Sequence, residues 1–243
     1  MKSSRSAIVF IIVMAAAGLS MLAYGMMNVQ SLKHYPFFVL LAVSAVASRM
    51  KLNLPGINGN MSVNLPFILI AAAELSLLEG MLIALVSSAA QTFPKAGNKL
   101  SPVKLLFNVN TMVLASGVCA LLWHWQSLAG HTWSGSLPLI VSCSAFFLIN
   151  TLPVATIISL TEGQGVMRIW SSILHLSFPY YLACTGLISI VSAISRQGSW
   201  AMPLAVFPVM LLMYRSYRVY FRRSAEASPA PPAKLQMAAA SSS

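Results

Sequence analysis

The chain has 243 residues, of which 58% are apolar and only 8% are charged, and its mean hydropathy is +0.78. Soluble proteins carry about 25% charged residues, so this chain has too little polar surface to cover so large an apolar core. The composition excludes a disordered chain and predicts an all-α, polytopic transmembrane helix bundle. The formal net charge of +11 first suggests a nucleic-acid or other anionic partner, so the positions of the charges decide its meaning.

Long apolar stretches begin near the N-terminus and recur along the chain. A helix needs roughly 20 mostly apolar residues to cross the hydrocarbon core of a bilayer. Stretches of that length occur at Ala7–Asn28, Val103–Trp125, Leu137–Leu160 and Leu176–Ser195. Each of them predicts a membrane-spanning helix.

Two other apolar regions are shorter. Pro36–Ser48 is followed by basic residues, and Ala201–Tyr214 reaches the length of a span only if the helix continues through Tyr220. Both predict additional helices at the two ends of the bundle.

The region Asn64–Phe93 is too long for one span and contains Glu79-Gly80 near its middle. A break at that dipeptide predicts two short helices, Asn64–Leu77 and Gly80–Thr92. The total is then about eight helices, or six or seven if the short ones are re-entrant.

The basic residues lie almost entirely on one side of the predicted bundle. With eight helices and a cytoplasmic N-terminus, only Lys33 and Arg196 of the 15 basic residues fall outside. Such a bias sets the orientation of membrane proteins and predicts that both termini are cytoplasmic. The charge therefore indicates membrane topology, not nucleic acid. The basic residues predicted to be inside are Lys2, Arg5, Arg49, Lys51, Lys95, Lys99, Lys104, Arg168, Arg215, Arg218, Arg222, Arg223 and Lys234.

The predicted membrane domain covers residues 1–223 and ends in a segment that alternates tyrosines and arginines. We expect Arg215, Arg218, Arg222 and Arg223 to be topology-setting, lipid-facing cations at the cytoplasmic surface, where long basic side chains extend toward the headgroups. Residues 224–243 are rich in Ala, Ser and Pro and predict a disordered cytoplasmic tail.

Polar residues inside apolar helices are the default candidates for function, because burying them without partners costs several kcal/mol. Asn64, Asn108, Asn110 and Asn150 are such residues. Asn108 and Asn110 point about 200° apart on a helix, so they cannot share one partner. The asparagines either hydrogen-bond helices together or contact a small ligand or ion.

Glu74 and Glu79 are two of the four acidic residues in the chain. Glu79 is expected to cap the helix that follows it, where the helix dipole favours an anion. Glu74 lies a turn inside the predicted span and is the better ligand candidate. The candidate ligand-binding residues are therefore Asn64, Glu74, Asn108, Asn110 and Asn150.

The sequence contains no catalytic or metal-binding signature. It has no Asp, no HExxH, GxSxG or phosphate-binding glycine motif, and no Cys/His spacing typical of zinc. We therefore expect no enzyme activity, no cofactor and no metal. Cys119, Cys143 and Cys184 are interpreted as small buried apolar residues.

Several short motifs occur along the chain at Gly56–Asn64, Leu106–Asn108, Asn150-Thr151, Pro179–Leu182 and Tyr214–Tyr220. Together they resemble those of the bacterial polytopic membrane sensor module found ahead of GGDEF and HD-type output domains. The resemblance covers about residues 35–223, and it implies an input domain whose last helix passes a signal to a cytoplasmic output domain. The sequence after Arg223 has 20 residues and no GGDEF or HD domain, so we expect a module without its own output. The architecture also resembles, more weakly, the S components of energy-coupling-factor vitamin transporters.

Three kinds of function follow as hypotheses. The first is a sensor-like or ligand-binding inner-membrane module that binds a small molecule or a protein partner. The alternative is a small-solute uptake component with Glu74 and the asparagines at its solute site. The third is an assembly partner that uses the small-residue stripe Gly80, Ala84 and Ser88, although packing within the bundle is the simpler use of that stripe.

Overall fold

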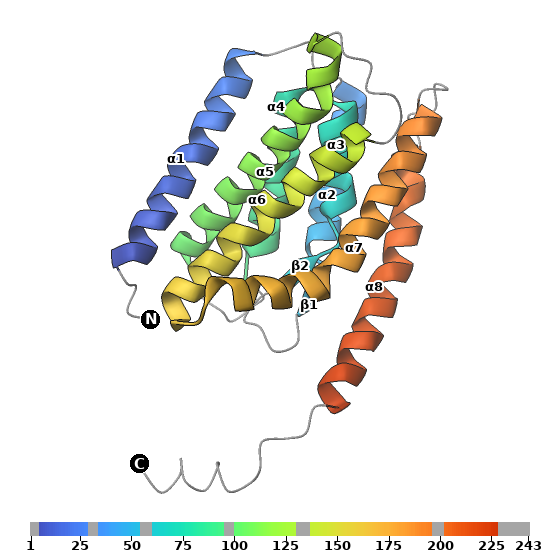
Figure 1. Ribbon diagram of the computed structural model, residues 1–243. Coiled ribbons are helices and arrows are strands. Elements are labelled where there is room, and N and C mark those ends of the chain that lie inside the picture. The colour runs from blue at the N-terminus through green and yellow to red at the C-terminus, as the bar shows by residue number, and fades with distance from the viewer. Residues whose placement is uncertain are drawn as a thin grey trace, which may run out of the picture.

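The computed structural model describes residues 5–28, 34–53, 60–94, 100–129, 137–195 and 202–227. Over these residues the chain forms eight helices and one short antiparallel ribbon (Figure 1), which confirms the all-α bundle. The elements are α1 Arg5–Met27, α2 His34–Ser48, β1 Lys51–Asn53, β2 Asn60–Ser62, α3 Leu65–Glu74, α4 Leu77–Thr92, α5 Pro102–Ala129, α6 Leu137–Glu162, α7 Val166–Ser195 and α8 Met202–Ala227.

The helices are unequal in length. Within the described residues, α1, α6 and most of α5 and α7 are long and apolar enough to cross a membrane, whereas α2, α3 and α4 are apolar but shorter. Large apolar side chains such as Ile12, Leu182 and Leu212 are at least 60% exposed. In a multi-pass membrane protein these side chains face lipid.

The helices α3 and α4 form a hairpin whose turn differs from the predicted one. The break lies at Leu75-Ser76, not at Glu79-Gly80, and the two helices therefore end and begin earlier than expected. Ser76 is the N-cap of α4, and Glu79 completes a capping box with it. Glu79 thus caps α4 as expected, from within its first turn. Gly80 lies inside α4, where a Cβ atom would be only 3.3 Å from Ala72 Cα, so it permits close packing of the hairpin.

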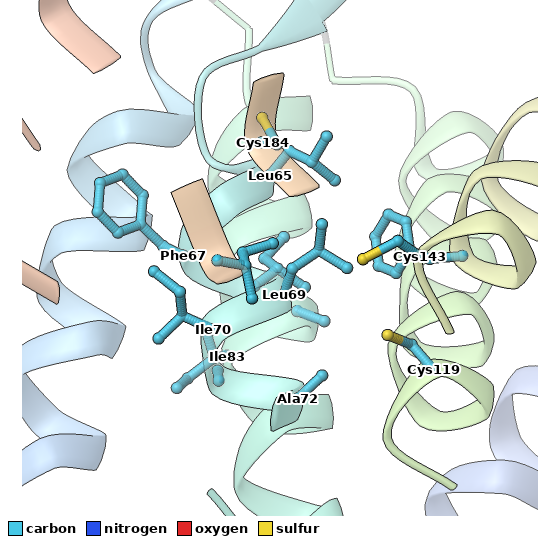
Figure 2. Packing of buried hydrophobic residues seen from close by; sticks show 14 of the residues in the cluster. Leu65, Phe67, Leu69, Ile70, Ala72, Ile83, Cys119, Cys143 and Cys184 are labelled. Atoms are coloured by element: carbon cyan, nitrogen blue, oxygen red, sulfur yellow. The ribbon is translucent and has the colours of Figure 1, made fainter. Parts of the chain in front are cut away.

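The helix α3 lies in the middle of the bundle and is buried on every side from Leu65 to Ala72. Within the described part of the chain, its side chains belong to one apolar cluster with residues from every other helix except α1. Figure 2 shows Phe67 on one side of α3, and Cys119 and Cys143 on neighbouring helices on the other side. All three cysteines are buried and unpaired, which confirms their interpretation as small apolar residues.

The helix α1 packs against α5 by close approach of the two backbones. A Cβ atom at Gly18 would lie 2.6 Å from Asn110 Cβ and 2.8 Å from its Cα, closer than real Cβ atoms come. A glycine is therefore required where the two helices cross.

The helix α7 has two parts (Figure 1). Its first turns run across the lower end of the bundle, where Ile169 and Ile173 pack on Ala155 of α6 and Trp170 Nε1 donates to Thr151 Oγ1 at 3.2 Å. The rest of α7 turns upward along the bundle, and Pro179 lies inside the helix. Proline removes a helical hydrogen bond and is the usual cause of such a bend.

The helix α8 packs on the bundle through Val206 and Met210, which are 3% and 1% exposed. Its far end reaches beyond the other helices, on the side where α1 begins (Figure 1). The helix continues to Ala227, so it includes the first residues of the predicted tail, and residues 228–243 lie outside the described part. Which side of the membrane this end faces stays a prediction.

Candidate functional site

Asn64 joins three elements near the start of α3. Its side chain is 3% exposed and makes no capping hydrogen bond to its own helix. Instead, Nδ2 donates to Ser87 Oγ of α4. Ser87 Oγ in turn lies 3.4 Å from the Ser44 carbonyl oxygen of α2, to which it donates a long hydrogen bond. Asn64 therefore links α3 to α4 and, through Ser87, to α2.

Asn108 and Asn110 point in different directions from α5, as predicted. Asn108 is exposed, and its Nδ2 donates to Thr92 Oγ1 at the end of α4, at 3.2 Å. Asn110 is 5% exposed and donates to the Leu106 carbonyl oxygen one turn earlier, at 2.8 Å. Its side chain lies against Gly18 of α1. The two asparagines thus serve two different helix contacts.

The acidic candidates lie on either side of the α3–α4 turn. Glu74 is the last residue of α3 and is partly buried. Glu79 is fully buried, and its Oε2 accepts hydrogen bonds from the Ser76 N–H at 3.0 Å and the Ser76 hydroxyl at 2.7 Å. In the described part of the chain, no group of three or more His, Cys, Asp or Glu residues could hold a metal ion.

Asn150 joins α6 to α7. Its Nδ2 donates to the Tyr181 hydroxyl at 2.6 Å, and the Tyr181 ring meets Phe147 of α6 edge to face, with ring centroids 4.6 Å apart and an interplanar angle of 80°. Tyr181 is 7% exposed. A polar and an aromatic contact therefore fix the same side chain against α6.

The neighbouring residue, Tyr180, faces α8. It is 1% exposed, and its ring lies 6.1 Å from that of Tyr217, at 82°. The two adjacent tyrosine rings are themselves 6.2 Å apart at 88°. We call Asn150, Tyr180, Tyr181 and Tyr217 the tyrosine junction. It brings together three of the motifs on which the family resemblance depends.

The four candidate asparagines make separate hydrogen bonds rather than one cluster. The amide groups of Asn64, Asn108 and Asn150 donate to different partners on α4 and α7, and this pattern is typical of interhelical hydrogen bonding. Ligand binding at Asn64, Glu74, Asn108, Asn110 and Asn150 stays a prediction. Ser87, Thr92, Tyr181 and Tyr217 could not be predicted as partners from the sequence, because two residues that meet across neighbouring helices follow no fixed spacing.

The arginines predicted at the surface lie on α8. Arg215 and Arg218 are exposed, on either side of Tyr217. Arg222 and Arg223 belong to the same helix, but their side chains lie outside the described part. The exposed pair is consistent with a helix that leaves the bilayer at this point.

A bundle of long apolar helices with lipid-facing outer surfaces defines a multi-pass membrane protein. The model of the MASE9 family, one of the MASE membrane-associated sensor domains, matches residues 8–220, and the chain belongs to this family. The match confirms the resemblance to a polytopic sensor module. No curated protein and no solved structure matches the chain.

Proposed function

We propose that this MASE9 module is a bacterial inner-membrane sensor that passes a signal from its helix bundle through α8 to a cytoplasmic protein. The observation that supports the proposal best is the arrangement of α8 in a member of a sensor family. It contacts the buried tyrosines of α7 through Tyr217 and then extends past the other helices (Figure 1).

The proposed orientation places the extended end of α8 in the cytoplasm. Arg215 and Arg218 are exposed on α8, and Arg49 Nη1 and Lys51 Nζ donate to the Phe93 carbonyl oxygen at the end of α4, at 3.4 and 3.3 Å. These cations stabilise the C-terminal end of a helix dipole and fit the positive-inside rule for the same face.

The proposed input is a small hydrophobic or amphipathic ligand, or a membrane protein partner, that binds the bundle near its buried asparagines. No chemical step is part of the proposal. The module would act by changing the position of a helix, since a ligand that binds one arrangement of the bundle better shifts the population toward it.

A photo-crosslinking experiment in native membranes tests the proposal. A photoreactive amino acid at Ser216, exposed on α8, is expected to give a crosslink to a specific protein that carries a cytoplasmic signalling domain. The same amino acid at Ile12, which is 60% exposed on α1, serves as the control and is expected to give lipid adducts only. Lipid adducts alone at both positions would count against the proposal.

Uptake measurements distinguish the transport alternative. Cells that express the wild type and cells that express Glu74→Ala with Asn110→Ala are compared for uptake of radiolabelled B vitamins. The sensor proposal predicts equal uptake in both strains, and a selective loss in the double variant would favour transport instead.

A further inference from the structure

We propose that the tyrosine junction is a coupling element that sets the position of α8 according to the packing of α7 on α6. The proposal rests on the proposed function, because it specifies how the output helix is controlled. It assigns Asn150, Tyr180, Tyr181 and Tyr217 as positioning residues.

The adjacent tyrosines Tyr180 and Tyr181 of α7 contact two different helices. Consecutive residues on a helix point about 100° apart, so Tyr181 contacts α6 while Tyr180 contacts α8. Both rings are almost fully buried, and each is held edge to face by an aromatic partner. Because the side chains are closely packed, a rotation of α7 cannot change one contact without changing the other.

Pro179 lies in α7 directly before the two tyrosines. Proline has no N–H, so the carbonyl of His175 cannot receive the usual helical hydrogen bond at this point. On the N-terminal side of Pro179, the first turns of α7 are fixed to α6 by the Trp170 hydrogen bond and by the packing of Ile169 and Ile173 on Ala155. The tyrosines follow on the other side, so the weakest point of α7 lies next to the junction.

Helix α8 is fixed to the bundle by contacts at several points along its length. Near its start, the ring centroid of Phe207 lies 6.2 Å from that of Phe67 of α3, and Met210 is buried. Tyr217 follows ten residues after Phe207, about 15 Å further along the helix, and contacts Tyr180. Met213 and Tyr214 also pack against the central cluster, and Tyr217 is the last described side chain of α8 that does so, so its loss frees the turns that follow. The Tyr180–Tyr217 contact therefore controls the direction of the last turns of α8.

The test measures the position of α8 by double electron–electron resonance in phosphatidylethanolamine/phosphatidylglycerol nanodiscs. Nitroxides are attached through ketone-bearing amino acids at Ile8 and Val219, which are 48% and 51% exposed, so the native cysteines stay unchanged. Asn150→Leu removes the donor to Tyr181, and Tyr217→Ala removes the ring that contacts Tyr180. Each variant is expected to shift the mean distance by about 2 Å or more, the size of the helix movements by which packed helices switch.

Two matched controls separate coupling from general damage. Asn108→Leu removes an asparagine that donates to Thr92, outside the junction, and Tyr217→Phe keeps the ring. Both are expected to retain the wild-type distance. If Asn150→Leu fails to fold, Tyr181→Phe removes the hydroxyl that Asn150 binds with a minimal change in packing and is expected to give the same shift.

The proposal would be overturned if Tyr217→Ala and the variant that removes the Asn150–Tyr181 hydrogen bond (Asn150→Leu or Tyr181→Phe) both kept the wild-type distance. A shift of equal size in Asn108→Leu would also overturn it. These outcomes are independent of the proposed function. If a signalling partner is crosslinked but α8 does not move in the variants, the proposed sensor function stands and the coupling role of the tyrosine junction is wrong. If α8 moves but no partner is crosslinked, the coupling role stands and the proposed function is wrong.

Discussion

At the scale of single residues, three of the four candidate asparagines act as hydrogen-bond donors to a side chain on another helix. Asn64 and Asn150 each reach a hydroxyl group on another helix, whereas Asn110 bonds to its own helix. In a bilayer such a hydrogen bond contributes about 0.6 kcal/mol on average and up to about 2 kcal/mol. Two residues of the same type can therefore differ in effect according to burial and partner.

The first prediction concerns Asn64. Asn64→Leu removes a buried donor to Ser87 and is expected to lower the free energy of unfolding by roughly 0.6–2 kcal/mol, measured by denaturant titration in nanodiscs. The matched control is Asn108→Leu, at an exposed asparagine, with an expected change within about 0.5 kcal/mol. Equal losses in the two variants would show that burial of the hydrogen bond does not matter.

The capping box of α4 shows which part of the α3–α4 turn could be predicted from the local sequence. Ser76 and Glu79 have the Ser-x-x-Glu spacing of a helix start, so the turn at Leu75-Ser76 was predictable. The Glu79-Gly80 dipeptide resembles a turn signal, but it lies within the first turn of α4. The role of Glu79 was predicted correctly, and the position of the break was wrong because the glycine serves packing against Ala72.

At the scale of elements, the contacts of α1 differ from those of the other helices. Among the described residues, none of α1 belongs to the central apolar cluster, and α1 approaches α5 at Gly18. The Gly80, Ala84 and Ser88 stripe of α4 is likewise buried within the bundle, so this face is not available to another chain. Small residues thus set the helix spacing inside the molecule.

The second prediction concerns the crossing of α1 and α5. Gly18→Leu forces the side chain against Asn110 and is expected to destabilise the protein by about 1–3 kcal/mol, as overpacking does, measured as a lower thermal unfolding midpoint. Gly186→Leu on α7 is the control, because nothing lies within 4 Å of a Cβ atom there. It is expected to be neutral or stabilising by up to about 1 kcal/mol. A comparable loss at Gly186 would contradict the close-approach argument.

At the scale of the whole molecule, composition and charge predicted the class of fold. Apolar runs predicted all eight helices that the described residues form, and four of these helices have the apolar length that a bilayer demands. The pairing of Asn150 with Tyr181, or of Tyr180 with Tyr217, could not be predicted. These contacts join residues far apart in sequence on consecutive helices, and each depends on how the helices rotate and bend, which single residues do not encode.

The third prediction concerns the orientation of the whole bundle. Asn28 and Gln164 are exposed at the ends of α1 and α6, on opposite sides of the predicted membrane. A membrane-impermeant maleimide is expected to label Asn28→Cys in intact spheroplasts and Gln164→Cys only after permeabilisation. The native cysteines are buried, so the wild type gives the background. The opposite labelling pattern would reverse the proposed topology.

The shortness of α3 gives the molecule an uneven hydrophobic thickness. Its ten residues cover about 15 Å, half of the roughly 30 Å hydrocarbon core. Asn64, at its start, bonds to Ser87, five residues before the end of α4, so α3 begins about 8 Å inward of that end. The polar ribbon that precedes α3 pairs its own backbone groups, as Lys51 with Ser62, which lowers the cost of placing them near lipid. A thinner bilayer would match this side of the bundle better than a thick one, so the thickness of the membrane itself acts on the helices that surround α3.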